Sequence, residues 1–103
     1  MEVLRRHDPR RVPLPLVLDS PHSGTDYPGD FDHLPHENAR RQAEDTFVGE
    51  LYAFAPEMGV TLVEALFPRA YIDPNRNLAD IDQALLAEPW PGPVTRSRKT
   101  ELG

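Results

Sequence analysis

The chain has 103 residues, the length of a single domain, and contains no cysteine. Disulfides and thiolate-bound metals are therefore excluded, so that a metal would have to bind His, Asp and Glu side chains. Seventeen acidic residues against eleven basic ones give a net charge of -6, which argues against nucleic acid as a partner. No apolar run approaches the ~20 residues of a membrane span and no signal peptide is recognisable, so we expect a cytoplasmic protein.

The first predicted strand follows a polar segment. Residues 1–11 are polar and charged and predict a loosely held arm or an irregular edge. Pro13 and Pro15 remove two backbone donors, so a regular strand can begin only after them. Residues 16–18 are the predicted strand. Their unbroken apolar character is typical of a strand that is covered on both faces in a parallel sheet.

A helix is predicted after a proline-rich loop. Apolar residues within 47–55 recur at helical spacing, and residues 44–46 place acids and a capping threonine at the amino end. Pro56 is expected to open a final turn and Gly59 to end it. Residues 37–43 are also good helix formers.

The second half predicts one more strand and a weaker helix. Residues 60–66 are β-branched and apolar, as in a strand, and residues 69–72 are expected to be extended. Residues 78–87 predict a helix, and residues 88–103 a mobile proline-rich tail. Strand, helix and strand in this order indicate an α/β layered fold, of which this chain would be an incomplete front part.

A histidine lies where the first predicted strand ends. His22 belongs to the Ser-Pro-His-Ser-Gly sequence at residues 20–24. Ligands and catalytic groups of α/β proteins gather at the carboxyl ends of strands, so His22 is a candidate ligand, against the alternative of a structural loop histidine. His7, His33 and His36 are expected to be solvated surface residues.

Two polar clusters could act with this histidine. Glu44 and Asp45 either cap the helix or turn one carboxylate inward to join His22 on a metal. Arg69, Asp73, Asn75 and Arg76 follow the second strand, either as an exposed turn held by ion pairs or as a site for a small anion. Arginine binds a carboxylate through two parallel hydrogen bonds, and Asp73 could orient an arginine from behind. Lysine cannot supply that geometry.

Three sequence blocks resemble the N-formylglutamate amidohydrolase (deformylase) family. They are residues 20–28, 44–48 and 67–77, and the likeness extends from about residue 16 to residue 82. The Arg-Ala-Tyr-Ile-Asp-x-Asn-Arg block combined with Ser-Pro-His-Ser-Gly is specific. The resemblance implies an α/β fold like that of zinc carboxypeptidases and aspartoacylases, with a mixed sheet between helices. It also implies hydrolysis of N-formyl-L-glutamate to formate and L-glutamate in histidine degradation.

The resemblance further implies a metal and the residues that bind it. Zinc would be the cofactor, with His22 as one ligand and an acid of the Glu44-Asp45 pair, preferably Asp45, as the second. Asn75 and Arg76 would hold the substrate's carboxylate with help from Ser23. Arg69 would polarise the scissile carbonyl, and Asp73 would support it. The partner is thus a small anionic N-acyl amino acid.

The sequence offers only two candidate zinc ligands, and several expectations follow from this. A catalytic zinc site needs about three protein ligands, so we expect the third ligand and the general acid-base beyond residue 103. The chain by itself should then have little activity, and its truncated sheet should tend to self-associate. Two alternatives stay open: a zinc amidohydrolase for another N-acyl amino acid, and a non-catalytic carboxylate-binding domain of the same fold.

Overall fold

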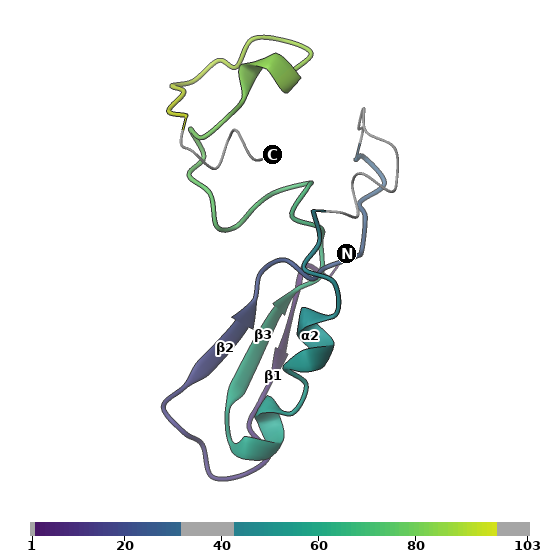
Figure 1. Ribbon diagram of the computed structural model, residues 1–103, viewed down its shortest axis with the longest axis vertical. Coiled ribbons are helices and arrows are strands. Elements are labelled where there is room, and N and C mark those ends of the chain that lie inside the picture. The colour runs from purple at the N-terminus through teal and green to yellow at the C-terminus, as the bar shows by residue number, and fades with distance from the viewer. Residues whose placement is uncertain (1, 32–42, 97–103) are drawn as a thin grey trace.

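The computed structural model describes residues 2–31 and 43–96. Three strands form one mixed sheet in the order β1-β3-β2, with bounds Leu4–His7, Val17–Ser20 and Thr61–Ala65 for β1, β2 and β3. The central strand β3 is antiparallel to β1 and parallel to β2 (Figure 1). The helical segments are short: α2 at Val48–Leu51 and the 3-10 helices η1 at Ala55–Met58 and η2 at Gln83–Leu85. The α/β character predicted from the sequence is confirmed.

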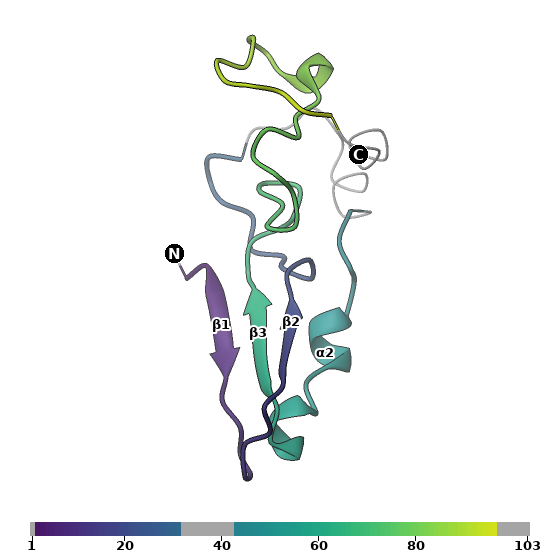
Figure 2. The same cartoon turned by 90° about the vertical axis from the view of Figure 1, so that its left-hand side faces the viewer.

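The helical segments of the described part of the chain cover one face of the sheet. Leu18 and Leu62 are register partners on the face that lies toward α2 and η1, and Leu62 packs there with Ala55 and Val60 in the buried core. Figure 2 shows α2 beside the sheet on this side. Because neighbouring side chains of a strand point to opposite faces, Val17 points the other way, and it is 59% exposed.

The strands correct two expectations. Residues 16–18 were predicted to be buried on both faces, but Leu16 is 51% exposed and β2 begins at Val17. The reason is that, within the described residues, β2 pairs only with β3 and no helical segment covers its second face. The predicted parallel pairing is confirmed. Residues 1–11 are not wholly irregular, since β1 forms a regular edge strand.

The predicted helix at residues 47–55 is wrong in length and in burial. Phe47 adopts a left-handed φ of 65° before α2, so the helix starts late, and no side chain caps it. The chain turns at residues 52–54 before η1 begins, and the large apolar side chains of this stretch stay exposed. Pro56 opens the final turn and Gly59, with a φ of 83°, ends it, as predicted.

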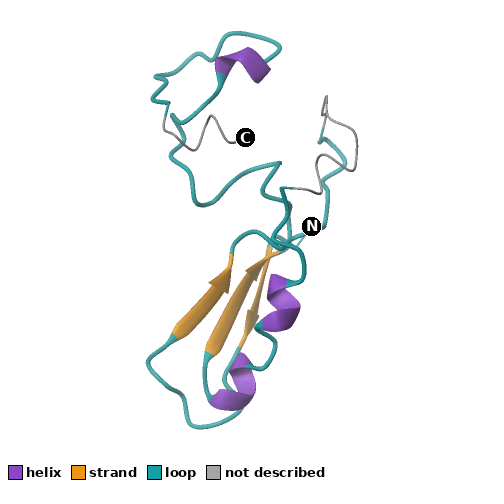
Figure 3. Ribbon diagram, in the orientation of Figure 1, coloured by secondary structure: helices purple, strands orange, loops and turns teal. Residues whose placement is uncertain are grey.

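The segment after β3 is mostly loop (Figure 3). Residues 69–71 form a turn instead of an extended piece, and residues 78–87 contain no helix beyond η2. Figure 1 shows this segment running past the ends of the strands instead of packing on the sheet. The Cα radius of gyration is accordingly 16.1 Å, against about 13 Å for a compact domain of this length.

Some expectations lie outside the described residues. These are the helix at residues 37–43, the histidines His33 and His36, and the end of the tail from residue 97. Self-association of the sheet stays a prediction. No helix among the described residues is long and apolar enough to cross a membrane.

Gly24 allows the loop after β2 to lie against the chain that leaves β3. A Cβ atom at Gly24 would lie 2.2 Å from the carbonyl oxygen of Phe67, and the amide of Asp26 donates to the carbonyl of Leu66 at 2.9 Å. We expect Gly24→Ala to lower the free energy of unfolding by about 1–3 kcal/mol, because the backbone must move to admit the methyl group. Urea unfolding measures the loss. Gly29→Ala is the matched control, since a Cβ atom there meets nothing within 4 Å, and an equal loss in both variants would contradict the prediction.

Candidate metal and anion site

The parallel pairing of β2 and β3 brings two loops together. Ser20, the last residue of β2, is the register partner of Glu64 near the end of β3. His22 follows two residues after β2, and the Arg69–Arg76 loop follows β3, so both lie at the carboxyl edge of the sheet. His22 is only 7% exposed. The structure thus brings His22 and the arginine-containing loop together at the strand ends.

Asp73 is the centre of this meeting. Its Oδ1 atom lies 2.8 Å from Nε2 of His22 and accepts a hydrogen bond from the amide of Asn75 at 2.9 Å. Its Oδ2 atom accepts from Nη2 of Arg69 at 2.9 Å and lies 3.6 Å from Nε of Arg76. Partial burial alone would raise the pKa of Asp73, but the Asn75 amide, Arg69 and His22 stabilise the charged form, and the pKa falls below its ordinary value.

Local sequence explains why the loop closes around this carboxylate. The amide of Arg76 donates to the carbonyl of Asp73 at 3.2 Å, which makes residues 73–76 a turn with Pro74 in its second position. Proline favours that position because its φ is already set, and an aspartate at the first position binds the amide two residues later. The Asp-Pro-Asn-Arg sequence therefore presents Asp73 inward.

Asp45 lies on the other side of the His22 ring. Its amide donates to the carbonyl of His22 at 3.0 Å, and its Oδ2 atom lies 3.7 Å from Nδ1 of His22. That separation is too long for a hydrogen bond, but it is close to the about 3.4 Å between two ligands of a tetrahedral zinc with ~2.1 Å bonds. Asp73 on the opposite nitrogen matches the carboxylate that metal-binding histidines commonly contact. His22 and Asp45 therefore fit two positions of a metal site.

The other predicted ligand is engaged elsewhere. Glu44 accepts a hydrogen bond from the hydroxyl of Tyr27. Ser23, predicted to contact substrate, shares a hydrogen bond of 2.6 Å with the buried Ser20. Ser23 and Glu44 both line a hollow of about 530 Å³ on the side of α2. Within residues 2–31 and 43–96, no group of three His, Asp or Glu side chains is placed to hold one metal.

Arg76 is held by a second carboxylate that sequence reasoning did not single out. Nη1 of Arg76 lies 3.7 Å from Oδ2 of Asp80, whose side chain is only 6% exposed. Its spacing of four residues from Arg76 is the one signal in the sequence that could have pointed to it. The contact between His22 and Asp73 was missed as well, because 51 residues separate the two.

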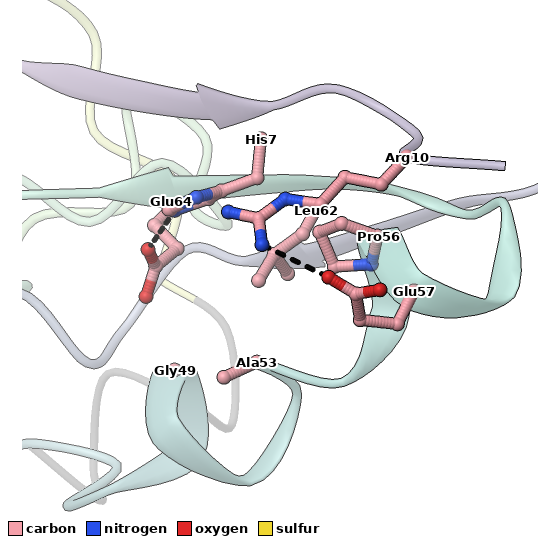
Figure 4. Close-up of a pocket in the computed structure, with 8 residues that line it drawn as sticks. All are labelled: His7, Arg10, Gly49, Ala53, Pro56, Glu57, Leu62 and Glu64. Atoms are coloured by element: carbon pink, nitrogen blue, oxygen red, sulfur yellow. Dashed lines mark hydrogen bonds and ion pairs between the residues drawn. The ribbon is translucent and has the colours of Figure 1, made fainter.

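A separate cavity lies between the sheet and α2 (Figure 4). It has a volume of about 220 Å³ and is lined by a hydrogen-bonded pair, His7 with Glu64 at 2.6 Å, and by an ion pair, Arg10 with Glu57 at 2.9 Å. None of the predicted site residues lines it. This cavity is therefore not the candidate site.

Comparison with known proteins identifies the family. Residues 14–102 match the family described as N-formylglutamate amidohydrolase. The chain belongs to this family. The crystal structure of N-formylglutamate amidohydrolase from Ralstonia eutropha JMP134 is similar over 100% of this chain and 37% of that chain, with 48% sequence identity and a TM-score of 0.86. No curated protein gives a significant match. The resemblance to N-formylglutamate amidohydrolases is confirmed, and the chain spans just over a third of the length of its structural neighbour.

The lowered pKa of Asp73 predicts how the stability of the fold depends on pH. A carboxylate with a depressed pKa stabilises the fold above its unfolded pKa of about 3.9, and this contribution is lost as the pH falls through the folded pKa. We expect Asp73→Asn to cost about 2 kcal/mol of unfolding free energy at pH 7 and progressively less below about pH 4.

Chemical denaturation at a series of pH values measures this difference. Asp8→Asn is the control, because its ion pair with Arg6 is exposed and contributes at most about 1 kcal/mol at any pH. A cost for Asp73→Asn that stays constant from pH 7 to pH 2 would contradict the prediction.

Proposed function

We propose that this chain forms the metal- and substrate-binding part of an enzyme that hydrolyses N-formyl-L-glutamate to formate and L-glutamate. The observation that carries the proposal is the position of His22 between Asp45 and Asp73, with Arg69 and Arg76 bound to the same Asp73. Membership of the N-formylglutamate amidohydrolase family supports the choice of substrate.

His22 and Asp45 would hold a divalent metal, with zinc as the expected ion. His22 would bind through Nδ1, because Nε2 already contacts Asp73 at 2.8 Å. When bound, zinc lowers the pKa of a bound water and polarises a carbonyl oxygen. In the tautomer with the proton on Nε2, His22 would donate a hydrogen bond to Oδ1 of Asp73, and the Nδ1 lone pair would face Asp45.

The arginine loop would bind and orient the substrate. Arg76 would hold the substrate's side-chain or main-chain carboxylate with help from Asn75, since guanidinium binds carboxylate through two hydrogen bonds. Ser23 would add a hydroxyl contact from the neighbouring loop. Arg69 is anchored to Asp73 through Nη2, so its remaining donors can stabilise negative charge that develops on the formyl oxygen. In the reaction, the oxygen of water joins the formyl carbon, the amide C–N bond breaks, and the departing nitrogen takes a proton.

The rest of the proposal concerns the whole enzyme. We propose that the third metal ligand and the general acid-base come from outside the residues described. We further propose that the mixed sheet belongs to a layered fold like that of zinc carboxypeptidases, and that the enzyme acts in histidine degradation in the cytoplasm. The match covers 37% of the structural neighbour, so most of that protein lies outside the matched region and could contain such residues.

Metal binding is the first test of the proposal. We expect the purified chain to bind one zinc ion, and His22→Ala to weaken binding at least about tenfold because it removes a ligand. Isothermal titration with Zn²⁺, with formation of the fold followed by circular dichroism, measures both. His7→Ala is the matched control, since His7 pairs with Glu64 on the sheet and lies outside the site. Equal affinities in wild type, H22A and H7A would contradict the proposed metal site.

One alternative function has an observation in its favour. Because no three-ligand group occurs within residues 2–31 and 43–96, the domain could bind small carboxylates without metal or catalysis. In that case N-formyl-L-glutamate binds equally well with and without zinc, and His22→Ala has no effect.

The proposed enzyme makes the opposite prediction for the same titration. We expect zinc to strengthen N-formyl-L-glutamate binding, and Arg76→Lys to weaken it about tenfold because lysine cannot bind bidentately. Arg96→Lys is the control, since Arg96 pairs with Asp82 on the surface. Ligand-observed NMR titration with and without zinc decides between the two functions.

A further inference from the structure

We propose that Asp80 is a positioning residue. Together with Asp73, it holds the guanidinium of Arg76 in one position and one orientation. The contact between Asp80 and Arg76 is a property of the fold. Its consequence for ligand binding rests on the proposed function, in which Arg76 holds the substrate's carboxylate.

Two carboxylates contact Arg76 at different nitrogen atoms. Oδ2 of Asp73 lies 3.6 Å from Nε, and Oδ2 of Asp80 lies 3.7 Å from Nη1. One contact alone would leave the guanidinium able to rotate about it. Attraction to carboxylates at two separate nitrogens, each at ion-pair distance, limits this rotation, and the arginine side chain is itself only 17% exposed. Water therefore screens these charges weakly.

Asp80 is suited to this role by its burial and by its backbone. The side chain of Asp80 is only 6% exposed, and an aspartate is seldom buried to this extent unless it is paired, as Asp80 is with Arg76. A turn holds the backbone, since the amide of Asp80 donates to the carbonyl of Asn77 at 2.9 Å, and the side chain of Asn77 accepts from the amide of Ala79 at 2.8 Å. The carbonyl of Ala79 accepts from the amide of Thr95 at 2.7 Å, which ties the turn to the following loop.

Asp73 alone is poorly suited to fix Arg76. Its two oxygens also contact His22, Arg69 and the amide of Asn75, all at 2.9 Å or less, whereas the distance to Arg76 is 3.6 Å. The orientation of Asp73 is thus set by the three closer donors. A second carboxylate is needed to determine where the guanidinium of Arg76 points.

The order of the Arg76 guanidinium can be measured directly. In the 103-residue chain with ¹⁵N-labelled arginine, the Nε–H resonance of Arg76, assigned through Arg76→Lys, should show slow solvent exchange and restricted motion. In Asp80→Asn, the Arg76 Nε–H should exchange quickly with solvent and the guanidinium should become mobile. In Asp80→Glu, which keeps the charge, the guanidinium should retain part of its order. Asp82→Asn is the matched control, because Asp82 pairs with Arg96 and caps η2. Backbone amide spectra show whether each variant is folded.

Either of two results overturns the proposal. One is an Arg76 resonance in D80N that is as ordered as in wild type. The other needs no variant to fold: it is a wild-type Arg76 guanidinium as mobile as that of the exposed Arg5.

Ligand titration separates this proposal from the proposed function. We expect D80N to bind N-formyl-L-glutamate about tenfold more weakly in the presence of zinc, within the range found for groups that orient binding residues, and D82N to bind as wild type does. If wild type does not bind the ligand, the proposed function fails, while the NMR measurement still decides whether Asp80 orders Arg76. If D80N releases Arg76 and still binds as tightly as wild type, the positioning role is overturned.

Discussion

The carboxylate of Asp73 connects the two loops on which the candidate site depends. His22 reaches it from the loop after β2, and Arg69 and the Asn75 amide reach it from the loop after β3. A partly buried charge is tolerated only where donors satisfy it, and here the guanidinium of Arg69 is a charged donor. The same contacts lower the pKa of Asp73, because they stabilise its charged form. Parallel pairing of β2 with β3 brings the loops close, and Asp73 sets their relative orientation.

The features predictable from the sequence are those determined by local chemistry. Strand β2 begins only after Pro13 and Pro15, Pro56 lies in the first turn of η1, and Gly59 ends η1 in a left-handed conformation. The parallel pairing followed from the apolar strands, and it placed His22 near the arginine loop without any knowledge of the side-chain contacts. The family was identified from motifs at residues 20–24 and 69–76, which lie in the loops where the contacts were found.

The features that were missed depend on distant packing. Apolar spacing at residues 47–55 predicted a helix with a buried face, yet Leu51 is 67% exposed, because α2 has few partners on this short sheet. A helix without a buried face gains little from its periodicity, and here it ends after four residues. The pairing of His22 with Asp73 spans 51 residues and leaves no local pattern. The sequence analysis did not single out Asp80, and its burial in the structure is what distinguishes it.

Charge balance links the two halves of the proposed function. Asp73 pairs with Arg69 and Arg76, Asp80 pairs with Arg76, and Asp45 lies beside His22. These three carboxylates outnumber the two guanidinium groups, so the five side chains together carry more negative than positive charge. Such a cluster would not by itself attract a dianion such as N-formylglutamate, because Coulomb repulsion opposes its approach. A divalent cation bound by His22 and Asp45 would reverse the sign of the cluster. In the proposed function the carboxylates would hold the arginines and the metal in place, and the metal would supply the excess positive charge. Substrate affinity would then depend on metal occupancy even though Arg76 would make the direct contact.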